Sequence, residues 1–381
     1  MRITGDWITR VETRAVCDAL TGAGHRALFV GGCVRNALLG VPVGDIDIAT
    51  DALPDTVMML AREAGLKPVP TGIAHGTITV VSGGVPHEVT TFRADIETDG
   101  RHAQVAFGQS IEADARRRDF TMNALYAAPD GAVIDPLGGL PDLRARRVRF
   151  IDDPAQRIRE DYLRILRFFR FHACYGDPEG GLDAEGLSAC AAARDGLATL
   201  SRERIGAEMR KLLGAPDPAP SIAAMQAAGV LSAILPGVDA RALAPLIHVE
   251  QQTETALDPL RRLAALGGED MASRLRLSKA EDRRLTRLRE GVAETTPPAE
   301  VGYRLGATDG GDILLLRAAL LGSPLAPDAF DDLRRGAAAV FPIRAADLMP
   351  AFTGPALGKR LAELEARWIA SGFTLTREDL L

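Results

Sequence analysis

The sequence predicts an α+β protein in which a small, sheet-containing domain precedes a long, all-helical remainder. Short β-like runs broken by Gly and Pro dominate the first 135 residues or so, whereas helix-period patterns continue from about residue 140 to the end. With 381 residues, the chain is long enough for two or three domains. We expect a head at residues 1–140, a helical neck at 141–215, and a helical body and tail at 216–381.

The composition is that of an ordinary folded protein, with 46% hydrophobic and 25% charged residues. The formal charge of −6 argues against a general nucleic-acid coat protein but leaves room for a local basic groove. Four dispersed cysteines without a C-x-x-C pair favour a reducing cytoplasm over a disulfide scaffold or a zinc site. The N-terminal residues have no apolar core and no later apolar stretch is long enough to span a bilayer, so we expect no signal peptide and no membrane partner.

Five β-like runs define the predicted sheet of the head: residues 27–30, 45–49, 77–81, 87–92 and 131–135. The segment 81–85, V-S-G-G-V, predicts a hairpin turn between the third and fourth runs.

The first candidate site follows the first run, where Gly31 and Gly32 lead into a predicted helix that ends at Gly40. Two glycines let backbone N–H groups approach a ligand at a helix N-terminus, which attracts anions. Arg35, one turn into the helix, can add a charged contact to phosphate. A tight strand-to-helix turn with a solvated Arg35 is the alternative.

Asp45 and Asp47 lie two residues apart in the second run, so on a strand their carboxylates point the same way. Adjacent like charges disfavour joint ionisation unless a cation lies between them, and Mg²⁺ prefers a few carboxylates plus phosphate oxygens. A solvated acidic edge is the alternative, although acidic residues are poor strand formers. Glu88 can share this face if its strand is a neighbour.

Two arginine-rich segments complete the candidate site. In residues 115–126, three arginines precede Asp119 and a predicted amphipathic helix, and this cluster could bind a triphosphate. In residues 158–171, charged side chains recur every three residues, which predicts a ridge along a helix. These side chains are Asp161, Arg164, Arg167 and Arg170. A solvated helix start and an ion-paired amphipathic helix are the respective alternatives.

Taken in order, these four elements resemble the class II nucleotidyltransferases of the tRNA CCA-adding enzyme and bacterial poly(A) polymerase family, within the polymerase-β-like superfamily. The matching segments are G-G-C-V-R-N-A-L-L-G with D-I-D-I-A-T, H-E-V-T-T-F-R, R-R-D-F-T-M-N-A-L and E-D-Y-L-R-I-L-R-F-F-R-F, over roughly residues 27–171. Residues 200–213 and 228–237 resemble the family's helical neck and body. The resemblance implies a catalytic head, a neck that recognises the nucleotide base and RNA, and a body and tail that bind tRNA.

The resemblance also implies a Mg²⁺ cofactor held by Asp45 and Asp47, with Glu88 as the third catalytic carboxylate. The nucleotide-binding positions that it implies are Gly32, Arg35, Arg118, Asp161, Arg164, Arg167 and Arg170. Asn36 departs from the pattern, because many relatives have Asp there, and asparagine keeps the hydrogen-bonding shape but loses the charge.

The implied reaction adds CCA to the 3′ end of tRNA from CTP and ATP and releases pyrophosphate. Cytosine and adenine both present an amino donor beside a ring-nitrogen acceptor, which complements an acceptor-only Asp161 beside a donor-only Arg164, whereas uracil and guanine present the reverse. Residues 71–80 resemble CCA-adding members, and residues 93–108 resemble the flexible loop with which full CCA enzymes switch from C to A. Poly(A) polymerase and a catalytically silent RNA-binding protein remain as alternatives, and no protein partner is expected.

A second basic stretch lies at residues 261–290, which contain nine basic and five acidic residues. It includes Arg261, Arg262, Arg283 and Arg284, and it predicts a surface for the tRNA backbone. A solvated helical face is the alternative.

Overall fold

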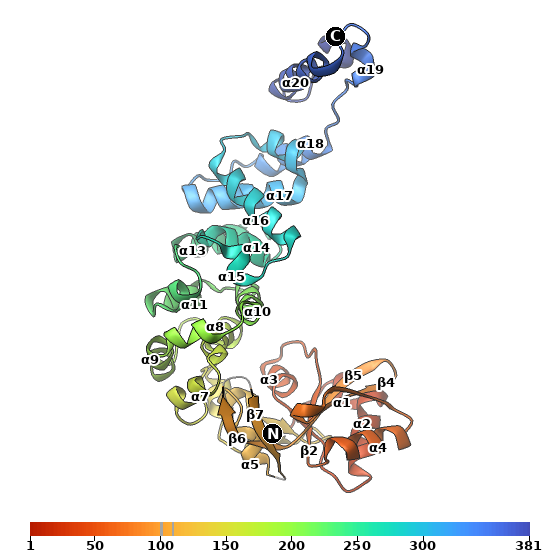
Figure 1. Ribbon diagram of the computed structural model, residues 1–381, viewed down its shortest axis with the longest axis vertical. Helices are drawn as coiled ribbons and strands as arrows, with labels where there is room; N and C mark the ends of the chain where they lie inside the picture. The colour runs from red at the N-terminus through yellow and green to blue at the C-terminus, as the bar shows by residue number, and fades with distance from the viewer. Residues whose placement is uncertain (100–101, 109) are drawn as a thin grey trace. The chain divides into compact units, whose positions relative to one another are not determined.

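The computed structural model describes residues 1–99, 102–108 and 110–381. The chain divides into two compact units, Met1–Ile234 and Leu235–Leu381 (Figure 1). Every strand that the described residues form ends before residue 135, and helices make up most of the remainder. This confirms the predicted α+β division.

Seven strands form one sheet in the order β3-β4-β5-β2-β1-β8-β9. Their bounds are β1 Leu28–Val30, β2 Asp47–Thr50, β3 Lys67–Gly72, β4 Thr77–Ser82, β5 Val85–Thr91, β8 Tyr126–Ala127 and β9 Val133–Ile134. Strands β2 and β5 are parallel and all other neighbours are antiparallel, so the sheet is mixed, as predicted. The predicted hairpin joins β4 to β5 through Gly83 and Gly84, which both have positive φ.

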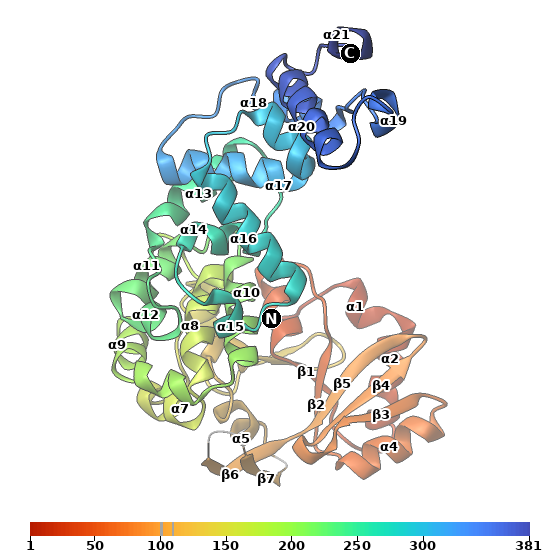
Figure 2. The same ribbon diagram turned by 45° about the horizontal axis from the view of Figure 1, so that its top comes forward.

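Two helices cover one face of this sheet, and Figure 2 shows both beside β3, β4 and β5. They are α2 (Val11–Thr21) and α4 (Pro54–Glu63). Each buries apolar residues four positions apart, Val16 and Leu20 in α2 and Val57 and Ala61 in α4. The other helices of the head are α1 (Asp6–Thr9), α3 (Gly32–Leu39), α5 (Ile111–Arg116) and α6 (Leu140–Arg144), with a 3₁₀ turn η1 at Ile73–His75.

Strands β6 (Arg93–Asp99) and β7 (His102–Phe107) pair antiparallel in a separate two-stranded sheet. Its strands flank residues 100 and 101, which lie outside the described residues. This is the segment that resembles the flexible loop of full CCA enzymes.

The amphipathic helix predicted after Asp119 is wrong. Residues 120–127 are buried without exception, so they have no polar face. They form only one 3₁₀ turn, η2 (Thr121–Asn123), before entering the sheet as β8. Because this segment crosses the core, burial rather than helical periodicity decides its conformation.

The rest of the first unit is helical: α7 (Pro154–Glu160), α8 (Leu163–Tyr175), α9 (Ala184–Ala192), η3 (Arg194–Thr199) and α10 (Arg202–Leu213) lie within the expected neck, and α11 (Ala219–Ala227) and α12 (Val230–Ile234) follow it. The continuous helix predicted over 158–171 is wrong, because Asp161 is extended (φ −156°, ψ 106°) and separates α7 from α8. Its Oδ1 accepts a hydrogen bond from the Leu163 amide at 3.0 Å, which stabilises the start of α8. Phe168 of α8 stacks on Phe150, and both rings pack at a tilt against Phe120, which fixes α8 against the head.

The second unit contains η4 (Ala240–Ala242), α13 (Leu243–Gln252), α14 (Pro259–Leu266), α15 (Met271–Leu275), α16 (Lys279–Ala293), α17 (Pro298–Leu321), α18 (Ala329–Ala338), α19 (Ala345–Leu348), α20 (Gly354–Ala370) and α21 (Arg377–Leu380). Gly306 interrupts α17 with a positive φ of 78°. Trp368 of α20 packs edge-on against Tyr303 of α17, with ring centroids 5.4 Å apart. Among the described residues, no helix is both long and apolar enough to cross a membrane.

Candidate active site

A cavity of about 850 Å³ in the first unit is lined by all ten residues that the sequence nominates. These are Gly32, Arg35, Asp45, Asp47, Glu88, Arg118, Asp161, Arg164, Arg167 and Arg170. They come from strands β2 and β5, helices α3 and α8, and the connections beside them. The cavity therefore brings together nominated residues up to 138 positions apart, from Gly32 to Arg170.

The acidic side of the cavity is built on the parallel pair β2–β5. Asp47 is the first residue of β2, and its backbone lies in register with Glu88 of β5. Residues in register on neighbouring strands point to the same face, so both carboxylates enter the cavity. Asp45 lies in a bend before β2 rather than on the strand, which corrects the expected strand start at residue 45.

The charge on this side is unbalanced. Burial, and after it the Glu88 carboxylate, raise the pKa of Asp47 to about 6, although Arg118 and Arg35 oppose the shift. A divalent cation against Asp47 and Asp45 would remove this penalty, so the residues present fit such an ion. Within the described part of the chain, no three His, Cys, Asp or Glu side chains are grouped closely enough to hold a metal by themselves. The ion would therefore need further oxygen ligands, which nucleotide phosphates provide.

The glycine turn brings an arginine against the backbone. Gly31 has φ 70° and ψ −120°, a conformation that favours glycine, and α3 begins at the next residue. A Cβ on Gly31 would lie 3.3 Å from Nη1 of Arg118. Arg118 is itself fixed, because its Nη2 donates to Asp114 Oδ2 at 3.1 Å and its Nε donates to the Tyr126 hydroxyl at 3.3 Å.

Arg35 is buried and already holds several protein partners. Its Nε and Nη2 donate to Asn36 Oδ1 at 3.1 and 2.9 Å, and Nη1 donates to Asn123 Oδ1. Nη2 also donates to the Tyr175 hydroxyl at 2.8 Å, and the guanidinium lies 3.9 Å from the Tyr175 ring centroid. Arg35 therefore ties α3 of the head to α8 of the neck. Asn36 still supports Arg35 without the charge of an aspartate, and its Nδ2 donates to the Pro42 carbonyl at 2.9 Å.

Asp161 and Arg164, the expected base-reading pair, both line the cavity, but each has another ionic partner. Asp161 Oδ2 accepts from Arg204 of α10 at 2.7 Å. Arg164 pairs with Glu160 at 2.6 Å and donates to the carbonyls of residues 157 and 117. Both side chains are thus held in one orientation, and a carboxylate with two such contacts retains lone pairs for a third donor.

Arg167 and Arg170 are held in the same way. Arg167 Nε donates to Asp119 Oδ2 at 2.7 Å, and Arg170 Nε donates to Glu208 Oε2 at 2.6 Å. The side chains of Asp119 and Glu208 are almost fully buried, so these pairs exchange little with water. Fixed guanidinium groups lose little rotamer entropy when they bind an anion.

Sequence reasoning missed three cavity residues that matter for the site: Asn123, Arg204 and Lys211. Asn123 accepts from Arg35, and its Nδ2 donates to Asp119. Its position in the R-R-D-F-T-M-N segment was a usable signal. Arg204 and Lys211 lie in residues 200–213, which match the family neck, but only the packing of α10 against α8 brings them to the cavity.

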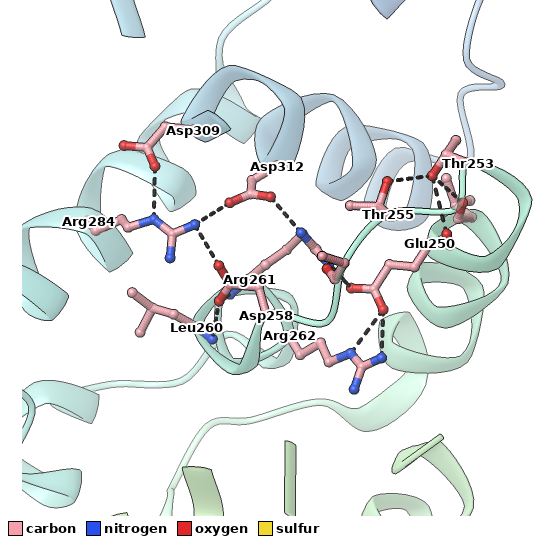
Figure 3. Close-up of polar contacts among 12 residues, drawn as sticks. Glu250, Thr253, Thr255, Asp258, Leu260, Arg261, Arg262, Arg284, Asp309 and Asp312 are labelled. Carbon is pink, nitrogen blue, oxygen red and sulfur yellow. Dashed lines mark hydrogen bonds and ion pairs between the residues drawn. The ribbon is translucent and has the colours of Figure 1, made fainter. Parts of the chain in front are cut away.

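The basic stretch 261–290 of the second unit is largely structural, which corrects part of its predicted role. Figure 3 shows Arg261 and Arg262 in a network with Glu250, and both arginines are buried. Arg284 pairs with Asp258 at 2.7 Å and with Asp309 at 2.8 Å. These three arginines therefore hold helices together, and only exposed residues such as Lys279, Arg283 and Arg289 stay available for a ligand.

Two family models match the chain. The poly(A) polymerase head domain matches residues 27–149, and the probable RNA- and SrmB-binding site of polymerase A matches residues 182–241. The mitochondrial CCA tRNA nucleotidyltransferase 1 of Homo sapiens is 41% identical over 201 residues, which are 52% of this chain and 46% of that protein. The CCA-adding enzyme of Bacillus cytotoxicus is 43% identical over 206 residues, 53% of this chain and 50% of that protein. The chain thus spans about half the length of the curated relatives it matches.

Among solved structures, the CCA-adding enzyme of Bacillus stearothermophilus in complex with CTP is 29% identical, with a TM-score of 0.72. That similarity covers 94% of this chain and 92% of the other. The CCA-adding enzyme of Thermotoga maritima, complexed with tRNA, has the same fold, with a TM-score of 0.70 and 19% identity over 96% of this chain and 92% of the other.

The fold is that of solved CCA-adding enzymes, and residues 27–149 match the poly(A) polymerase head domain. More narrowly, the two matched segments and the similar proteins are those of the tRNA CCA-adding enzymes and bacterial poly(A) polymerases, which this chain resembles. Enzymes of this family generally depend on a divalent metal. The predicted family resemblance is therefore confirmed.

Proposed function

We propose that this protein adds CCA to the 3′ end of tRNA without a nucleic-acid template, using CTP and ATP and releasing pyrophosphate. The observation that carries the proposal is the cavity itself, in which an acidic side faces a set of fixed arginines. The named relatives add support, since they are CCA-adding enzymes. We propose the cytoplasm as the compartment, because all four cysteines are free thiols.

In the proposed reaction, the 3′-hydroxyl of the RNA attacks the α-phosphorus in line and pyrophosphate leaves. Asp45 and Asp47 would hold Mg²⁺, with Glu88 as the third carboxylate. Mg²⁺ bound there supplies charge neutralisation for the attacking and leaving oxygens. Arg118, held by Asp114 against the glycine turn, would bind the triphosphate together with the N-terminus of α3. Gly32 allows the backbone to come close to the phosphates, and Arg35 would act from the buried link between head and neck.

We propose that Asp161 and Arg164 select the base. The carboxylate accepts from the amino group of cytosine or adenine, and the guanidinium donates to the neighbouring ring nitrogen. Uracil or guanine would place like polarity opposite both groups, at about 1–3 kcal/mol for each mismatched buried group. Two mismatches, about 2–6 kcal/mol together, correspond to a discrimination of about thirtyfold or more. Arg204 holds Asp161, and Glu160 holds Arg164, so the selecting pair is preorganised.

Arg167 and Arg170 would complete the nucleotide site from α8, each oriented by a buried carboxylate. We propose that the body and tail bind tRNA. The exposed cations of α16 would make these contacts, whereas Arg261, Arg262 and Arg284 have structural partners. The match of residues 182–241 to an RNA-binding model lies mostly in the neck and ends before α16, so it supports RNA binding by the neck.

Poly(A) addition is the main alternative, because it uses the same catalytic motifs. The segment 71–80, T-G-I-A-H-G-T-I-T-V, favours CCA addition, since it resembles CCA-adding members. Extension of a tRNA that already ends in CCA into a long A tail would reverse this choice.

The test is incubation of the pure protein with Mg²⁺, a tRNA truncated at its 3′ end and each nucleotide in turn, with products read at single-nucleotide resolution. We expect two C additions from CTP and then one A from ATP, with little incorporation from UTP or GTP. Asp47→Asn should abolish incorporation, whereas Asp55→Asn, an exposed acid of α4, serves as the matched control and should not change it. No incorporation by the unmodified protein would favour the catalytically silent RNA-binding protein.

A further inference from the structure

Helix α10 carries three charged residues at helical spacing, Arg204, Glu208 and Lys211, and the first and last of them line the cavity. Positions i, i+4 and i+7 share one face of a helix. The first two make ion pairs: Arg204 with Asp161, which precedes α8, at 2.7 Å, and Glu208 with Arg170 of α8 at 2.6 Å. Lys211 lines the same cavity, but its side chain makes no hydrogen bond or ion pair with any residue that the structure describes.

This unpaired ammonium contrasts with the arginines around it, because their charges already have carboxylate partners. Arg164, Arg167 and Arg170 pair with Glu160, Asp119 and Glu208. Lys211 is also exposed, so it stands at the open edge of the cavity. A flexible lysine with a hydrated charge suits a phosphate that arrives from solvent.

The position of Lys211 favours the RNA strand over the incoming nucleotide as its ligand. Seven residues at 1.5 Å each put Lys211 about 10 Å along α10 from Arg204, which holds the proposed base-reading carboxylate. A cavity of 850 Å³ is near the upper end of the range of about 300–1,000 Å³ for ligand pockets, which leaves room beside a nucleotide. Of the two substrates, only the RNA must continue past the edge of the cavity into solvent.

We propose that Lys211 binds a backbone phosphate of the RNA strand whose 3′-hydroxyl is extended. The inference rests on the proposed nucleotidyl transfer and adds a contact for its acceptor substrate. Lys211 is then a substrate-binding residue of the neck, and it sets the affinity for RNA rather than the choice of base.

The test measures binding of a tRNA truncated at its 3′ end, by fluorescence anisotropy over a series of salt concentrations. Loss of one phosphate contact to a single strand should reduce the slope of log affinity against log salt by about 0.7. For Lys211→Ala, the KM for this tRNA should rise roughly tenfold, while the KM for CTP and the kcat at saturating RNA stay within about twofold. Lys211→Arg should restore most of the affinity and the slope, because it keeps the charge.

Lys67→Ala is the matched control, since Lys67 is an exposed lysine of the same unit on β3, outside the cavity lining, and it should leave RNA binding unchanged. An unchanged salt slope in Lys211→Ala, or a raised KM for CTP with unchanged RNA affinity, would overturn the inference. Thermal unfolding of the variants separates misfolding from lost binding, and Lys211→Gln gives a second neutral variant. Failure of the unmodified protein to add nucleotides would count against the proposed function, whereas the salt slopes test Lys211 without any turnover.

Discussion

Replacing Glu250 by glutamine is expected to destabilise the second unit strongly, because this carboxylate is the anion between two buried arginines. Its exposed fraction is 2%, and it accepts from Arg261 Nε at 2.7 Å and from Arg262 Nε and Nη2 at 2.9 and 2.8 Å. Breaking a buried ion pair by removing one partner costs about 3–5 kcal/mol. Glutamine keeps one accepting oxygen, and Arg261 keeps Asp312 at 2.6 Å, so we expect the lower value, about 3 kcal/mol.

Urea unfolding provides the assay, because the chain has two tryptophans and each unit contains one of them. In a Trp7→Phe background, fluorescence reports on Trp368 alone, a buried residue of the second unit. With a urea dependence of about 1–3 kcal/mol per molar, the loss of about 3 kcal/mol lowers the midpoint by about 1–3 M.

The matched control removes an exposed carboxylate of the same unit. Asp239 pairs with Arg241, whose side chain is 90% exposed, so Asp239→Asn should leave the midpoint unchanged. An equal midpoint in Glu250→Gln and Asp239→Asn, with unchanged urea dependence, would refute the structural role that we give to the network in Figure 3.

Three further predictions concern base choice, acid stability and RNA binding. In single-nucleotide incorporation, Asp161→Ala should reduce the preference for CTP and ATP over UTP and GTP by up to about a hundredfold, and Arg204→Gln should reduce it less. Unchanged selectivity in both variants would contradict base selection by Asp161 and Arg164. Although burial raises the pKa of Asp114, Arg118 and its neighbour at 117 hold it down at about 2. This depressed pKa contributes stability that is present above about pH 4 and is lost as the pH falls toward 2, so in acid titration followed by circular dichroism Asp114→Asn should remove about 2 kcal/mol of that dependence. Arg283→Glu should weaken tRNA binding, and the difference from the unmodified protein should be largest at low salt. If the variant and the unmodified protein bind tRNA with equal affinity at both low and high salt, α16 is not part of the RNA surface.

The sequence was sufficient to predict the order of the main elements near the site, because turn residues and hydrophobic spacing are local signals. Gly31 and Gly40 bound a helix where predicted, and Gly83 with Gly84 makes the predicted hairpin. The segment 120–127 was misjudged, since it is buried on all sides and its period carries no information about conformation. The short strand β8 that it forms depends on β1, which is far away in sequence.

The candidate site shows the same division. The ten nominated residues could be identified from motifs, and all of them line one cavity, but their roles stay predictions. The partners of these residues could not be predicted. Arg204 lies 43 positions from Asp161, and Glu208 lies 38 positions from Arg170, so neither pair leaves a local pattern. The burial of Arg262 could not be predicted either, because a run of basic residues has the same sequence pattern whether its side chains contact water or buried carboxylates.

The ion pair between Asp161 and Arg204 has an evolutionary consequence under the proposed function. The base that is selected depends on Asp161, whose orientation is fixed by Arg204 of α10. A change of base preference would therefore require coordinated substitutions at both positions. A single substitution at Asp161 or at Arg204 leaves the other charge unpaired in a half-buried position. It weakens the existing base preference without creating a new one. The added sequence is thereby protected against drift in a way that a nucleic-acid template, rewritten by one base change, is not.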